Sequence, residues 1–69
     1  MTLTIDLEQE ADGRWVAEVP ELPGVLAYGA TDGEAVAKAE ALALRVFAER
    51  LEHGETSALV SLAFTRVAA

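Results

Sequence analysis

The chain has 69 residues, of which 52% are hydrophobic, and carries a formal net charge of −7 at pH 7. This length predicts a single domain, residues 1–69, whose core is small because much of the hydrophobic fraction is alanine. With only five Lys and Arg residues, the composition argues against direct nucleic-acid binding and favours a basic protein as the partner.

Composition also bears on chemistry and location. Cysteine is absent, which excludes disulfides, thiolate catalysis and cysteine-bound zinc. No apolar run reaches the roughly 18–20 residues of a membrane span, and the opening Met-Thr-Leu-Thr-Ile-Asp lacks the basic start of a signal peptide. We therefore expect a cytoplasmic protein that makes no contact with a membrane.

Two segments of alternating hydrophobicity near the N-terminus predict a β-hairpin. Their apolar positions are Leu3, Ile5 and Leu7, then Trp15, Ala17 and Val19. Gly13 in the loop between them suits the left-handed position that ends a three-residue turn. The register that follows contains the inner pairs Leu7–Ala17 and Ile5–Val19 and the outer pairs Asp6–Glu18 and Glu10–Arg14.

The segment after the hairpin is rich in residues that fix the backbone. Pro20 and Pro23 end the hairpin, Gly24 and Gly29 allow turns, and Val25–Tyr28 predicts a short third strand. Thr31 and Glu34 have the spacing of a capping box, which begins a helix from Asp32 to about His53. The apolar stripe of that helix contains Val36, Ala39, Ala43, Val46, Phe47 and Leu51. Gly54 is expected to terminate it.

The segment Ala58–Val67 predicts a fourth strand. Its inner positions are Val60, Leu62 and Phe64, and its outer positions are Leu59, Ala63 and Val67. The order β-β-β-α-β predicts an α+β fold in which one helix packs on one face of a four-stranded mixed sheet. A right-handed crossover places the fourth strand parallel to the first and beside it. The other sheet face has no helix, so its mixture of apolar and acidic residues is the candidate contact surface.

The order of these motifs resembles the HicB antitoxin family over nearly the whole chain. The matching residues are Trp15, the turn Pro20-Glu21-Leu22-Pro23-Gly24, the step Gly29-Ala30-Thr31 and the pair Glu34-Ala35. The resemblance implies a truncated ribonuclease-H-like fold and an antitoxin that masks a small basic HicA-type toxin, which cleaves RNA. HicB proteins commonly carry a further C-terminal DNA-binding module. This sequence shows none before Ala69, so we expect no autorepression.

The residues expected to bind a basic partner are Asp6, Glu8, Glu18 and Glu21. Asp6 lies opposite Glu18 in the predicted register, and a basic partner would relieve the repulsion between these two carboxylates. The alternative interpretation is a solvated sheet face of an acidic protein, because exposed charges usually contribute little.

The sequence predicts no catalytic, cofactor or metal site. A ribonuclease-H-like nuclease holds metal ions with carboxylates, and the predicted fourth strand supplies no acidic residue. His53 lies near the helix C-terminus, where its charged form favours the helix dipole. Ser57 and Ser61 have no neighbouring base that would activate a nucleophile. We therefore expect a protein that is not an enzyme.

The predicted helix also offers a surface for self-association. Six alanines give it a surface of small residues: Ala35, Ala37, Ala39, Ala41, Ala43 and Ala48. Leu42 and Leu44 lie partly outside the apolar stripe. They indicate a contact between copies of the chain, or simply high helix propensity. We expect a homo-oligomer. The alternative to an antitoxin is an orphan homo-oligomeric domain that binds a small ligand or has a structural role.

Overall fold

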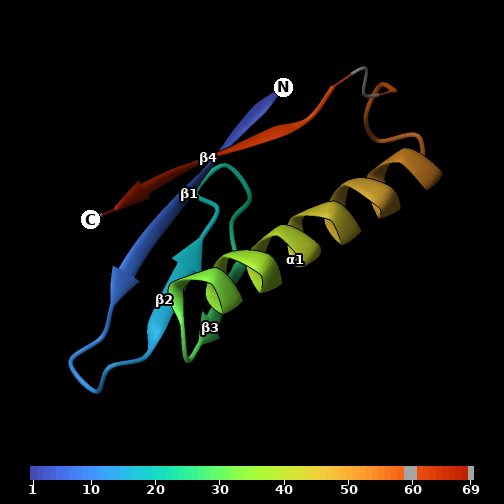
Figure 1. Ribbon diagram of the computed structural model, residues 1–69. Coiled ribbons are helices and arrows are strands. Elements are labelled where there is room, and N and C mark those ends of the chain that lie inside the picture. The colour runs from blue at the N-terminus through green and yellow to red at the C-terminus, as the bar shows by residue number, and fades with distance from the viewer. Residues whose placement is uncertain (59–60, 69) are drawn as a thin grey trace.

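The computed structural model describes residues 1–58 and 61–68. Its elements are β1 (Thr2–Gln9), β2 (Trp15–Glu18), β3 (Leu26–Gly29), α1 (Asp32–Glu52) and β4 (Ala63–Ala68). The strands form one sheet in the order β3-β2-β1-β4, and α1 lies across one face of it (Figure 1). β4 is parallel to β1, and the other strand pairs are antiparallel. The predicted α+β class, element order and mixed sheet are confirmed.

The β1–β2 hairpin has the predicted register over its paired residues. Asp6 lies opposite Glu18 and Leu7 lies opposite Ala17. The loop contains Gly13 at φ 93° and is closed by the Glu10 amide, which donates to the Arg14 carbonyl at 2.7 Å.

The pairing of β1 with β2 stops before the expected Ile5–Val19 pair. β2 ends at Glu18, and the Val19 amide points away from β1 and donates to the Val25 carbonyl at 3.0 Å, in line with the register of β2 and β3. Val19 and Ile5 are nevertheless both fully buried. Val19 therefore lies in the core on the predicted face, although its pairing with Ile5 is not part of the β1–β2 ladder.

The third and fourth strands begin later than expected. β3 begins at Leu26 and includes Gly29, because the Val25 amide is used within the turn, where it donates to the Leu22 carbonyl at 3.0 Å. β4 begins at Ala63 rather than Ala58, because Ala63 already pairs with Thr2, the first residue of β1. Leu59 and Val60, which were expected within this strand, lie outside the described residues.

The core lies between α1 and the sheet. The sheet contributes Leu3, Ile5, Leu7 and Ala17, the turn contributes Val19, Leu22 and Val25, and the helix contributes Ala35, Val36, Ala39, Ala43 and Phe47. Gly29 allows the helix to begin close to β3, because a Cβ at this position would lie 2.5 Å from the Ala35 nitrogen. A 21-residue helix is about 31 Å long, whereas a four-residue strand spans about 13 Å. The second half of α1 therefore extends beyond β2 and β3.

The ends of α1 follow the sequence signals. The Thr31 hydroxyl accepts a hydrogen bond from the Glu34 amide at 3.1 Å, which is one half of the predicted capping box. The Glu34 carboxylate pairs with Lys38 at 2.9 Å, and this contact lowers the pKa of Glu34. The helix ends at Glu52, and Gly54 follows at φ 67°. Nowhere in the described part of the chain does a helix have both the length and the apolar character needed to cross a membrane.

Candidate functional site

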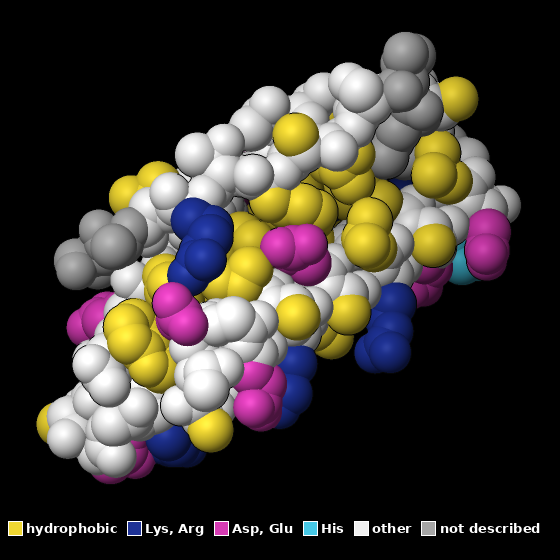
Figure 2. All heavy atoms as spheres, in the orientation of Figure 1, with side chains coloured by type: hydrophobic (Ala, Val, Ile, Leu, Met, Phe, Trp, Pro, Cys, Tyr) yellow, Lys and Arg dark blue, Asp and Glu magenta, His cyan; other side chains and the backbone are white. Residues whose placement is uncertain are grey.

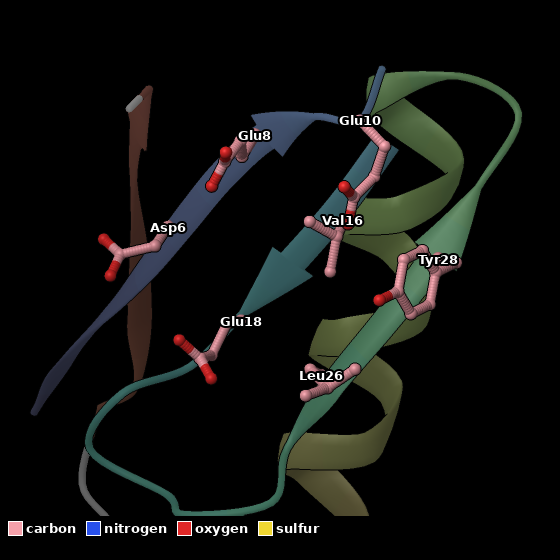
Figure 3. A pocket seen from close by; sticks show the side chains of 7 residues that line it. All are labelled: Asp6, Glu8, Glu10, Val16, Glu18, Leu26 and Tyr28. Carbon is pink, nitrogen blue, oxygen red and sulfur yellow. The ribbon is translucent and has the colours of Figure 1, made fainter. Parts of the chain in front are cut away.

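The face of the sheet opposite α1 contains a shallow hollow of about 220 Å³. Period-two alternation creates it, because side chains that follow the buried positions of a strand point to the other face. The residues that line it are Asp6, Glu8, Glu10, Val16, Glu18, Leu26 and Tyr28 (Figure 3). Three strands or their ends thus contribute side chains to one surface.

Four carboxylates share this hollow, and we call Asp6, Glu8, Glu10 and Glu18 the acidic face. Asp6 on β1 lies directly opposite Glu18 on β2. Within residues 1–58 and 61–68, none of the four carboxylates forms an ion pair or accepts a side-chain hydrogen bond. The acidic face therefore concentrates negative charge that the fold itself does not neutralise.

Apolar side chains form the other side of the hollow. Val16 is half-buried, and Leu26 and Tyr28 are 40% and 42% exposed. The Arg14 guanidinium lies 4.8 Å from the centre of the Tyr28 ring and is also paired with Asp12 at 2.8 Å. This cation is thus held at the hairpin end, where it steadies the Tyr28 ring rather than neutralising the carboxylates.

Of the four residues expected to bind a partner, Asp6, Glu8 and Glu18 come together in the hollow, and Glu21 does not. Both carboxylate oxygens of Glu21 accept from the Thr4 amide, at 3.1 and 2.9 Å. Hydrogen bonds from its own backbone amide and from Thr4 lower the pKa of Glu21. Because β2 ends at Glu18, the Glu21 side chain supplies the acceptor that the strand no longer provides to β1.

Sequence reasoning placed Glu10 on the outer face but not among the binding residues, and it missed Leu26 and Tyr28 as members of this surface. Leu26 and Tyr28 could have been found from the sequence, because they alternate with the half-buried Ala27 and therefore point to the opposite face of β3. The placement of β3 at the edge of the sheet beside β2 was needed to see that they border the carboxylates. Glu10 follows the last residue of β1 and keeps the predicted position opposite Arg14, with its amide donating to the Arg14 carbonyl.

The motif residues of the HicB resemblance serve the fold. Trp15 pairs with Gly29 and packs against the core, while Pro20 and Pro23 are exposed in the turn. Gly24 adopts φ 88°, which favours glycine. Thr31 and Glu34 cap and support the first turn of α1. None of these residues lines the hollow.

The acidic side chains do not converge as metal ligands would. Among the described residues, no group of three or more His, Asp or Glu side chains is placed to hold a metal ion. His53 is exposed after the end of α1, with its Nδ1 3.6 Å from a Glu55 carboxylate oxygen. The hollow therefore offers electrostatic and apolar contacts.

Comparisons with protein-family models, with characterised proteins and with solved structures found no match. The resemblance to HicB-like proteins therefore stays a prediction from the quoted sequence motifs. The candidate site does not depend on these motifs, because its geometry follows from the strand register and from the side chains themselves.

Proposed function

We propose that the chain is a non-enzymatic, HicB-like protein-binding module that sequesters a small basic HicA-type toxin in the cytoplasm. The observation that supports this proposal is the acidic face, where four carboxylates without a counter-charge in the described structure border exposed apolar side chains. A basic protein surface with apolar side chains complements both features, whereas the phosphate groups of nucleic acid would be repelled by the carboxylates.

The proposed masking follows from what an RNA-cleaving toxin requires. Such a toxin must present Lys and Arg side chains to phosphate groups, because phosphate contacts dominate its affinity for RNA. Carboxylates on the acidic face would occupy the same cations and thereby compete with RNA. The charges would accelerate the encounter, while the exposed Leu26 and Tyr28 beside them would supply apolar contacts.

The test begins with capture of the tagged chain from its own cells at low and at high salt. A small basic protein that is released as salt rises, and whose RNA cleavage is inhibited by the purified chain, supports the proposal. Recovery of the chain with copies of itself alone contradicts it.

A matched pair of variants then locates the contact. Asp6→Asn/Glu8→Gln/Glu18→Gln removes three charges from the acidic face, and Glu40→Gln/Glu49→Gln/Glu52→Gln removes three from α1. We expect the first variant to lose about tenfold or more in affinity and to show a weaker salt dependence, because direct charge contacts are lost. The second variant should differ little from the unmodified chain. Equal losses in both variants would exclude the acidic face as the binding surface.

The second candidate is an orphan homo-oligomeric domain with a small-ligand or structural role. The observation that favours it is the exposure of apolar side chains outside the hollow, with Leu44 49% and Leu51 40% exposed on α1. Of the six helix alanines considered for self-association, Ala35, Ala39 and Ala43 are already buried in the core, and Ala37, Ala41 and Ala48 are exposed. A contact between copies therefore needs a surface other than a continuous alanine stripe.

A further inference from the structure

The sheet has two edge strands, β3 and β4, and β4 is the one with the incompletely covered apolar surroundings. β4 is the last strand in the order β3-β2-β1-β4, so in the described part of the chain only β1 pairs with it. The Ala63 amide donates to the Met1 carbonyl at 3.0 Å. Because backbone groups alternate in direction along a strand, Ala63, Thr65 and Val67 point theirs toward β1, and Phe64 and Arg66 point theirs outward. An edge of this kind is a template for another strand.

The hydrophobic core is also incompletely covered on this side. α1 packs on β3, β2 and, to a smaller extent, β1. Figure 2 shows hydrophobic side chains gathered at the surface between β4 and α1, on the helix side of the sheet. Phe64 on β4 and Leu62 just before it are half-buried, and Val67 on the opposite face of β4 is 46% exposed. A strand added beyond β4 would cover apolar surface on both faces.

Charge favours association of two copies at the β4 edge over association through the acidic face. Each copy carries a net charge of −7, so contact through the carboxylate-rich surfaces would be opposed by repulsion. β4 contains Arg66 and no acidic residue, and Arg66 is paired with Asp32 at 3.0 Å. Two copies that meet at β4 therefore keep their acidic faces apart.

We propose that two copies of the chain associate by antiparallel pairing of their β4 strands around a twofold axis at Thr65. This register pairs Phe64 of each copy with Arg66 of the other, so the outward amides and carbonyls of both residues are satisfied. A register centred on Arg66 would instead place two like charges directly opposite each other, which is unfavourable. A register centred on Phe64 pairs fewer residues of β4.

The product is one continuous eight-stranded sheet. A twofold axis perpendicular to the sheet places both helices on one side and both acidic faces on the other. The association is independent of the proposed toxin binding, and salt distinguishes the two. Salt weakens attraction to a basic partner, whereas it screens repulsion between acidic copies and so strengthens the dimer.

An introduced cysteine tests the register directly, because the chain has none of its own. Opposed Thr65 residues form a non-hydrogen-bonded pair, whose Cα atoms lie about 4.5 Å apart, within reach of a disulfide. We expect Thr65→Cys to form a covalent dimer under mild oxidation. The control is Thr4→Cys, on the same face but one strand inward, where the two cysteines would lie about 15 Å apart. Equal crosslinking in both variants, or none in Thr65→Cys, overturns the register.

A second pair of variants tests whether backbone pairing holds the dimer. Arg66→Pro removes the outward amide, and Arg66→Ala keeps it, while both remove the pairing with Asp32. Sedimentation equilibrium should give Arg66→Pro a dimer dissociation constant about tenfold or more higher than that of Arg66→Ala, because each dimer loses two hydrogen bonds. Equal dissociation of the two variants, or an unmodified chain that is monomeric at every concentration and salt tested, overturns the proposal.

Discussion

The two faces of the sheet are built by the same strands and differ in almost every physical property. On β1, Leu3, Ile5 and Leu7 are at most 6% exposed beneath α1, while Asp6 and Glu8 between and beside them face the open hollow. The covered face stabilises the fold by removing apolar area from water. The open face gathers like charges, which oppose folding slightly and remain available for a partner. Variants on neighbouring residues can therefore separate stability from binding.

The largest effect is expected from truncating the covered face. Ile5 is fully buried, so Ile5→Ala should lower the free energy of unfolding by about 2–5 kcal/mol. Glu8→Ala, three residues along β1 on the open face, should change it by about 0.5 kcal/mol or less. Urea unfolding followed by circular dichroism measures both. Similar losses in the two variants would contradict the division of the sheet into a stabilising and a free face.

The next effect concerns how closely the helix approaches the covered face. A Cβ on Gly29 would lie 2.5 Å from the Ala35 nitrogen, so Gly29→Ala should cost about 1–3 kcal/mol. Gly33 is the second residue of α1 and has open space around it, so Gly33→Ala should stabilise by about 0.5–1 kcal/mol. Thermal unfolding should shift in opposite directions for the two variants. A stabilised Gly29→Ala variant would show that the helix does not need this close approach.

A smaller effect is expected from the charges of the open face. Glu18→Gln removes the carboxylate opposite Asp6 and should raise the free energy of unfolding by a few tenths of a kcal/mol at low salt. Glu8→Gln is the control, because Glu8 lies opposite Val16 rather than another acid. The difference between the variants should shrink as salt is added. A gain that does not depend on salt would point to a cause other than repulsion.

The smallest effect separates Glu21 from the acidic face. Because the pKa of Glu21 is lowered in the folded state, its carboxylate contributes stability above the ordinary pKa of glutamate, about 4.3. That contribution is lost as pH falls through the lowered folded value. The unmodified chain should therefore exceed Glu21→Gln in stability near neutral pH, and the two should converge in acid. A pH-independent difference between their unfolding free energies would contradict a carboxylate contact with the Thr4 amide.

Residues at the hairpin and the helix start show why much of the fold was predictable. The Gly13 loop specifies the Asp6–Glu18 register, and Thr31 specifies the first turn of α1, since both signals act over a few neighbouring residues. The start of β4 was not predictable in this way. Ala58–Leu62 has suitable strand composition, but pairing requires a partner, and β1 begins at Thr2 opposite Ala63.

Part of the candidate site was predictable because it depends on local signals in the hairpin. Asp6, Glu8 and Glu18 follow from alternation on two strands joined by a short loop. Tyr28 and Leu26 required the position of β3 beside β2, and Glu21 required the hydrogen bond that a turn residue makes to a distant amide. A side chain in a turn has no periodicity from which its direction can be inferred.

The sequence by itself determined the order of the elements, the alternation that divides the sheet into two faces, and the ends of the helix. These properties depend on local backbone preference and on side-chain period. Only the tertiary structure decided which carboxylates share the hollow and that the Glu21 carboxylate accepts from the Thr4 amide of β1. It also decided that β4 is an edge strand, paired among the described residues with β1 alone, and that Phe64 on it is half-buried. Those properties depend on contacts between segments far apart in the chain, whose geometry no local pattern specifies.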